Sequence, residues 1–360
     1  MSDSFVRDRL PPDMDRTMAE LSSSGAVRQL YGETPRGNLD PLVLRRLIGR
    51  ACQDGRLGPV LALSVQLATA LPLLAESAVT PCAREVLDAC LAGEEVVAVA
   101  ATDETAGSDL VGAKSAVALE GTEKLVLRGR KRWVTSALFA RHALVLAKHR
   151  PGRHFTNFTW FLVPLAAAGV SVSPVDTTLF EGAGLGHLTF DGVEIAPEWV
   201  LGGFGRGLAM FSRHITVERL ASATWAIHLC HTVISRTVRR LDDRQVDDLP
   251  LSRNPAVRQR LAGCLVQLHG LNALWERLRE RIAVEHDAVA GALLKAASAA
   301  TVDQVMTACS QFHGADGFRS GGVQQMRAEA AVFGIGGGAT ELMLDVVADH
   351  LPALLKELES

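Results

Sequence analysis

The chain has 360 residues, of which 48% are hydrophobic and 21% are charged, and its formal net charge is -3. This length can hold two or three domains or one large core. The near-neutral charge, without blocks of like charge, gives no reason to expect a nucleic acid as a partner.

Three features bear on localisation. The first residues, MSDSFVRDRLPPDMDR, are polar and acidic, unlike a signal peptide. The most apolar stretch, residues 57–79, is interrupted by Pro59, Gln66 and Pro72, so it is predicted to be a buried core helix rather than a membrane span. The six cysteines form no CxxC pair and indicate buried thiols in a reducing compartment. We therefore expect a cytoplasmic protein without a membrane partner.

The predicted secondary structure changes twice along the chain. Residues 1–95 carry helical patterns that begin at Asp or Thr caps and end on glycine, as in TPCAREVLDACLAGE, and are predicted to form an N-terminal α-helical domain. Residues 96–204 hold short β-rich runs between Gly, Pro, Asp and basic turns, which indicate a middle β domain, a barrel or two packed sheets. Residues 205–360 return to three-to-four apolar spacing over long stretches and are predicted to form a C-terminal helical bundle. The expected fold class is α+β.

Five segments carry a resemblance to a known family. They are ATDETAGSD (101–109), GRKRWVTSALFARHALVLAK (129–148), LTFDGVEIAPEWVLGGFGRGLAMF (188–211), QFHGADGF (311–318) and IGGGATEL (335–342). In the same order, they resemble conserved segments of the acyl-CoA dehydrogenases, from TEPxAGSD to the late I-x-x-G-T-x-E-I loop. The resemblance covers about residues 15–355, and it implies an N-terminal helical domain, a middle β-barrel or sandwich and a C-terminal four-helix bundle.

For such a protein the resemblance implies FAD, held between the β domain and the bundle and completed by a neighbouring subunit of a homodimer or homotetramer. The residues that match cofactor contacts of the family are Thr102, Trp133, Thr135, Arg244, Gln311, Gly314, Gly338 and Thr340. On the residues alone, Trp133 can instead be a core aromatic of a strand. Ser108 matches a substrate-binding residue beside the thioester arm, although AGSD can also be a plain turn capped by Asp109.

The family chemistry requires a carboxylate near the α-carbon of an acyl thioester, in a site that closes and excludes water. Many members place this base in the late loop, where this chain has only Gly336–Gly338. Isovaleryl- and long-chain-type members place it on a helix directly before an arginine, and TVERL supplies Glu218 and Arg219 at that position. We predict that Glu218 is the base and that Arg219 orients it or binds the acyl carrier. The alternative is that Glu218 is a solvated helix residue or a salt-bridge partner.

Two other sites are considered and not favoured. A dinucleotide-binding glycine motif must follow a strand, whereas a helical pattern precedes Gly336–Gly338. The histidines are scattered, and His228 and His231 lie one helical turn apart without a third ligand in view. No metal site is therefore predicted.

Three departures from the family pattern suggest a specialised biosynthetic member. In RQVDD, Asp247 and Asp248 replace an aromatic residue and a glycine, and these carboxylates would repel a pyrophosphate. Ala339 stands where the family has a threonine, although Thr340 could take over its role, and Ala315 replaces a glycine.

The resemblance implies an FAD-dependent dehydrogenase of an acyl thioester, carried by CoA or by a carrier protein. Its electron acceptor would be an electron-transfer flavoprotein or oxygen. The alternatives are a flavin monooxygenase on the same fold and a relative that binds a ligand without redox chemistry.

Overall fold

The computed structural model describes residues 25–32, 37–53, 55–104, 107, 109–120 and 124–359. The chain divides into two compact units. The first holds the described residues up to Leu47 together with Gly58–Ile215, and the second holds Ile48–Leu57 and the residues from Thr216 onward. The long helix α7 (Gly207–Asp243) crosses this division.

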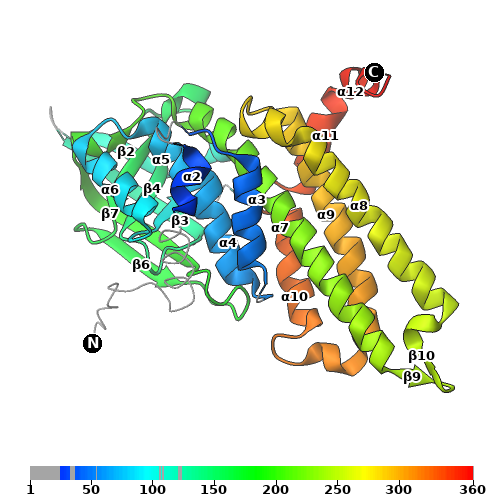
Figure 1. The fold of residues 1–360 in the computed structure, drawn as a ribbon. Helices are drawn as coiled ribbons and strands as arrows, with labels where there is room; N and C mark the ends of the chain where they lie inside the picture. Colours follow the sequence, from blue (N-terminus) through cyan, green and yellow to red (C-terminus); the bar gives the residue numbers. More distant parts are fainter. Residues whose placement is uncertain are drawn as a thin grey trace, which may run out of the picture. The chain divides into compact units, whose positions relative to one another are not determined.

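Short helices form the N-terminal part of the chain (Figure 1). They are α2 (Ala26–Tyr31), α3 (Pro41–Ala51), α4 (Leu57–Val65), a π-helical turn (Gln66–Ala70), α5 (Leu71–Ser77) and α6 (Pro81–Ala92). The sequence explains the bounds of α6, because Thr80 Oγ1 accepts from the Ala83 N–H at its start and Gly93 turns left-handed at its end.

The segment Leu57–Ser77 is long and apolar enough to cross a membrane. However, 83% of its most apolar window is buried inside the protein, as in a core helix. Gln66 shows why a polar residue is placed there, since its Oε1 accepts from the Val97 N–H at the start of the first strand at 3.0 Å. A side-chain oxygen thus satisfies a buried backbone donor.

The β domain contains β1 (Val97–Ala100), β2 (Ala116–Glu120), β3 (Lys124–Val134), β4 (His142–Lys148), β5 (Phe158–Pro164), β6 (Val170–Pro174), β7 (Gly186–Ile195) and β8 (Val200–Leu201). The strand order is β6-β7-β3-β2-β4-β5-β8, with β1 paired to β4 in parallel. β4 and β5 pair antiparallel, and Leu144 lies opposite Leu162. Both strands are almost wholly buried, as their continuous apolar sequences predict.

The second unit is built from long helices, α7, α8 (Pro255–Ala283) and α9 (Ala288–His313), with the shorter α10 (Val323–Ala330), α11 (Thr340–Asp349) and α12 (Leu351–Lys356). A hairpin of β9 (Gln245–Val246) and β10 (Leu249–Pro250) connects α7 to α8 at one end of the bundle (Figure 1). Trp275 on α8 is fully buried and donates to Thr224 Oγ1 on α7 at 2.8 Å. Asp287 caps α9 by accepting from the N–H groups of Val289 and Ala290, each at 2.9 Å.

Candidate functional site

The predicted cofactor contacts of the first unit gather at a bulge near the end of β3. The register between β3 and β7 shifts between Lys131 and Val134, and Trp133 within this shift has a φ of +54°. A left-handed conformation is uncommon for a bulky residue and costs of the order of 1–3 kcal/mol, and such residues cluster at functional sites. The bulge turns the side chain outward, and 55% of Trp133 is exposed. Trp133 is therefore not the core aromatic that the alternative interpretation describes.

A histidine on β7 supports this bulge. The backbone N–H of Trp133 donates to His187 Nδ1 at 3.2 Å, and the two rings meet edge to face with centroids 6.2 Å apart. Burial lowers the pKa of His187, and the charge of Arg132 lowers it further. Because only a neutral imidazole can accept through Nδ1, this shift favours the hydrogen bond that holds the bulge. The sequence interpretation, which treated the histidines as scattered, missed His187.

Thr102 lies beside the bulge because a buried ion pair joins their two segments. Lys131 is fully buried, with its Nζ 3.9 Å from Asp103 Oδ2. The carboxylate of Asp103 also accepts from three backbone N–H groups at 2.6–2.8 Å. The backbone N–H of the residue before Trp133 donates to Thr102 O at 3.1 Å. The structure therefore brings Thr102 and Trp133 together, with the half-buried Thr135 directly after the strand.

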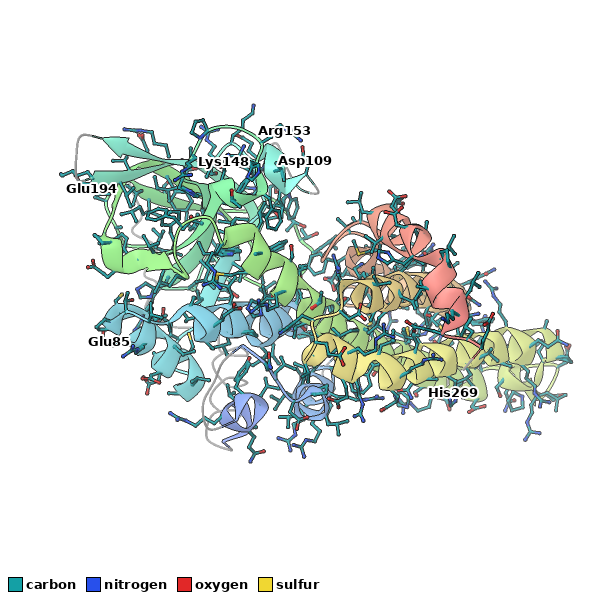
Figure 2. The ribbon with its side chains drawn as sticks, turned by 90° about the horizontal axis from the view of Figure 1, so that it is seen from above. Glu85, Asp109, Lys148, Arg153, Glu194 and His269 are labelled. Carbon is teal, nitrogen blue, oxygen red and sulfur yellow. The ribbon has the colours of Figure 1, made fainter. Side chains whose placement is uncertain are left out.

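Ser108 lies outside the described residues, so its contact with the substrate stays a prediction. Its neighbour Asp109 accepts from the Gly112 N–H at 3.1 Å, which is the turn cap that the sequence allowed. Asp109 also pairs with Arg153 at 2.7 Å, and Figure 2 shows the two side chains together on the β domain. The hydrogen bond from Arg153 is the main cause that lowers the pKa of Asp109.

In the second unit, Glu218 lies beside the glycine-rich loop before α11. A Cβ atom placed on Gly337 would be 3.8 Å from Glu218 Oε1 and 3.7 Å from Arg219 Cγ. The Nε of Arg219 donates to Gly337 O at 2.9 Å, which ties α7 to the loop. Glu218 is half-buried rather than fully exposed on the surface of α7. The predicted base and a glycine from the loop that lacks a carboxylate are therefore neighbours.

Arg219 is enclosed on both sides. A Cβ atom on Gly291 of α9 would lie 3.6 Å from its Cδ, and one on Gly338 would lie 3.5 Å from its guanidinium. Burial lowers the pKa of Arg219, while Glu218 raises it. An arginine bonded to a loop carbonyl is suited to orienting Glu218, which favours this role over a grip on the acyl carrier.

A residue that sequence reasoning missed completes the group. Lys295 of α9 is fully buried and donates from Nζ to Phe333 O, and its Cε would lie 3.7 Å from a Cβ atom on Gly337. Burial lowers the pKa of Lys295 to about 8, Arg219 lowers it as well, and Glu218 raises it. The available signal was a single lysine within the apolar run ALLKAAS, since lysine is almost never fully buried unless it is paired.

The other two predicted residues of this loop have structural contacts. Gly338 has a φ of +111°, and a Cβ atom there would lie 2.8 Å from Met343 Cε. Thr340 begins α11, and its Oγ1 donates to Gly334 O at 3.3 Å. Thr340 thus supplies a hydroxyl that Ala339 cannot.

The remaining predicted cofactor contacts lie at the opposite end of the bundle. Arg244 follows Glu218 by about 26 residues, nearly all of them in α7, which is roughly 39 Å of helix. Gln311 and Gly314 are exposed at the end of α9. One chain therefore places Arg244, Gln311 and Gly314 far from Glu218.

The RQVDD departure forms a tight turn. Val246 pairs with Leu249 across it, and Asp247 and Asp248 have φ values of +51° and +62°. Positive φ at both central residues is the pattern of a type I′ turn, in which aspartate is tolerated. Both carboxylates are exposed.

Comparison with known proteins identifies the fold. Residues 98–193 match the acyl-CoA dehydrogenase middle domain, and residues 205–351 match the acyl-CoA dehydrogenase C-terminal domain. The chain belongs to the acyl-CoA dehydrogenase family. This confirms the family, the α+β fold class and the acyl thioester dehydrogenase function that the sequence predicted.

Two curated relatives of this acyl-CoA dehydrogenase family member align with most of its length. The acyl-CoA dehydrogenase AFT10-1 of Alternaria alternata is 25% identical over 348 residues, which cover 91% of this chain and 80% of that protein. The acyl-[acyl-carrier-protein] dehydrogenase MbtN of Mycobacterium sp. (strain MCS) is 26% identical over 347 residues, covering 91% and 84%. The glutaryl-CoA dehydrogenase from Mycobacterium smegmatis, solved in complex with FADH2, has a TM-score of 0.85 at 18% identity, with 96% of this chain and 88% of that chain covered.

The residues around the Trp133 bulge of the first unit can be tested for their fit to a flavin. A planar ring system needs an exposed aromatic face and nearby hydrogen-bonding groups, and the bulge at Trp133 presents such a face beside Thr102 and Thr135. Trp133 holds a left-handed backbone conformation and leaves more than half of its side chain exposed. The residues therefore suit a bound flavin.

Proposed function

We propose that this protein is an FAD-dependent acyl thioester α,β-dehydrogenase in which Glu218 removes the α-proton of the acyl group. The observation that carries the proposal is the position of Glu218 Oε1 beside Gly337, whose carbonyl Arg219 binds. Bound FAD would supply a two-electron acceptor for the β-hydride. The protein would hold it with Thr102, Trp133 and Thr135.

The residues of the second unit would perform the proton step. Glu218 takes the α-proton, and the electron pair of that C–H bond forms the α,β double bond. The β-hydrogen would leave with the electron pair of its own bond, as a hydride, to the bound flavin. A carboxylate in a half-buried site is a stronger base than one in water, because desolvation disfavours its charged form. Arg219 keeps the carboxylate near the loop, since its guanidinium spans from α7 to Gly337 O.

A complete cofactor site would require a second copy of the chain. Arg244 lies roughly 39 Å of helix away from Glu218, and Gln311 and Gly314 lie near the same end of the bundle, so we infer that they contact the FAD of a neighbouring subunit. A homodimer is the smallest assembly that satisfies this arrangement, and a homotetramer also does.

The substrate would be an acyl group carried by CoA or by an acyl carrier protein. Support for the second carrier comes from MbtN, which is named as an acyl-[acyl-carrier-protein] dehydrogenase. The electron acceptor would be an electron-transfer flavoprotein or oxygen, and the protein would act in the cytoplasm.

Anaerobic titration of the purified protein with acyl thioesters tests this function. We expect a yellow protein whose flavin absorbance bleaches with the right thioester, offered on CoA and on carrier protein. Glu218→Gln should keep the flavin and slow the bleaching by roughly 10²–10⁴-fold, the usual contribution of a general base. Glu341→Gln is the matched control, because Glu341 is the exposed carboxylate that follows the same loop, and it should bleach like the wild type.

Other outcomes would identify the alternatives. Bleaching of Glu218→Gln at the wild-type rate would show that the base lies elsewhere. Oxygen consumption by the reduced flavin with oxygenation of the ligand would indicate a monooxygenase. A folded protein without flavin absorbance, even after incubation with FAD, would indicate a ligand-binding relative without redox chemistry.

A further inference from the structure

Lys295 is the one charged side chain of α9 that is fully buried among the described residues. Its Nζ donates to the carbonyl of Phe333, which is itself buried and packs against Trp225 with ring centroids 4.6 Å apart. Burying an ammonium group is costly unless hydrogen bonds and an opposite charge compensate for the lost water. The position of Lys295 therefore calls for a partner that carries negative charge.

Glu218 is that partner by position. The Cε of Lys295 and the Oε1 of Glu218 lie 3.7 Å and 3.8 Å from the same point, the Cβ position of Gly337. The two atoms can be no farther apart than about 7.5 Å, the sum of these distances. At this separation in a poorly hydrated site, two unit charges interact appreciably.

We propose that Lys295 is a positioning residue for the proton step, whose buried ammonium holds the Phe333–Gly338 loop against α9 and keeps Glu218 ionised when the site is dry. The inference rests on the proposed function of Glu218. Lys295 is enclosed by protein, so it acts through the loop and through Glu218. Without this cation, only Arg219 would oppose desolvation, and a larger share of Glu218 would be protonated and unable to accept the α-proton.

Other charged groups of the second unit have contacts of their own. Arg219 is the second cation beside Glu218, but its Nε is already bonded to Gly337 O. Arg279 of α8 pairs with Glu276 and Glu280 of its own helix. From α10, Glu329 accepts from Gln325.

The acidic groups of α11, Glu341, Asp345 and Asp349, are exposed. The three atoms nearest to a Cβ at Gly337 belong to one carboxylate and two cationic side chains, and Lys295 is the fully buried one of these.

Infrared difference spectra across pH test the inference directly, with Glu218→Gln used to assign the carboxyl band of Glu218. We compare wild type with Lys295→Met, which removes the charge and the donor, Lys295→Gln, which keeps a donor, and Lys295→Arg, which keeps the charge. Ser298→Ala is the matched control, since Ser298 is buried one turn later on α9 and bonds only Leu294 O of its own helix.

Loss of the positive charge makes ionisation of Glu218 less favourable, so the pH midpoint of its band should rise. With Lys295 Cε at most about 7.5 Å from Glu218 Oε1, we expect an upward shift of roughly one to two pH units in Lys295→Met and Lys295→Gln. Lys295→Arg and Ser298→Ala should titrate like the wild type. If Lys295→Met fails to fold, Lys295→Gln makes the same comparison.

Kinetics separate an electrostatic role of Lys295 toward Glu218 from a purely structural role. In the wild type, the acid limb of flavin bleaching by the thioester should follow the Glu218 band and move upward with it in Lys295→Gln. A purely structural role would lower the melting temperature or the bleaching amplitude but leave the midpoint unchanged, and coincident midpoints of wild type and Lys295→Gln would overturn the inference. The band is measurable without substrate, so absent bleaching of the wild type would refute the proposed function and leave this test intact.

Discussion

The three consecutive glycines of the late loop offer a graded test of the structure by single alanine substitutions. Each one meets a different environment. Gly336 has an ordinary backbone conformation, and a Cβ atom there would lie 3.3 Å from Val332 Cγ2. Gly337 has a φ of +72° with no neighbour closer than 3.7 Å. Gly338 has a φ of +111°, and its Cβ would lie 2.8 Å from Met343 Cε.

These differences set the size of each effect. Gly336→Ala should change the free energy of unfolding by less than about 1 kcal/mol, because the loss of unfolded-state entropy offsets the close contact. Gly337→Ala pays the left-handed conformation of an L-residue, about 1 kcal/mol. Gly338→Ala combines strain of about 1–3 kcal/mol with displacement of Met343, which is buried against Ala292 and Ala296 and adds about 1 kcal/mol.

Thermal unfolding of the purified variants measures this order. At roughly 2–4 °C per kcal/mol for a unit of this size, Gly337→Ala should melt about 2–4 °C below wild type and Gly338→Ala about 4–16 °C below it. Gly336→Ala should melt within about 3 °C of wild type. A Gly338→Ala variant as stable as wild type, or a Gly336→Ala variant less stable than Gly337→Ala, would refute the loop conformation that places Gly337 beside Glu218.

Two further predictions concern the cofactor-facing residues. Trp133→Ala should lower the flavin content of the purified protein at least tenfold. Its melting temperature should stay within about 3 °C of wild type, because the side chain is mostly exposed. Unchanged flavin absorbance per protein would contradict the flavin role of Trp133. Asp248→Gly should raise the free energy of unfolding by about 0.5–1 kcal/mol, since glycine removes the strain of an L-residue at a φ of +62° in the type I′ turn. A lower melting temperature would show that Asp248 stabilises the hairpin.

The sequence predicted the parts of the fold that depend on local pattern. The Thr80 cap and Gly93 correspond to the start and the end of α6, and the switch to short β-rich runs near residue 96 corresponds to the start of β1. The partition into three domains stays a prediction, and the structure divides the chain into two compact units whose boundary falls inside α7. Periodicity does not contain this boundary, because the helix is continuous across it.

Site residues within a sequence motif were predicted, and site residues brought together only by tertiary packing were missed. Glu218 and Arg219 are adjacent in the sequence, so the resemblance could point to both. Lys295 reaches the same point from α9, about 77 residues later, and His187 meets Trp133 only through the pairing of β3 with β7. Local spacing carries no information on either contact, although a lysine within an apolar helical run is a usable sign of a buried charge.

The bare glycine of the late loop and the carboxylate on α7 have one explanation. Any side chain at Gly337 would begin within 3.8 Å of Glu218, Arg219 and Lys295. A carboxylate there would face Glu218 across a poorly hydrated gap, and two like charges at such a distance cannot both stay ionised. A single base in this space therefore requires that one of the two positions carries no acid, and this chain keeps Glu218. Glycine at 337 also leaves its carbonyl accessible to Arg219, so the residue that lacks a side chain supplies the backbone atom that orients the neighbouring base.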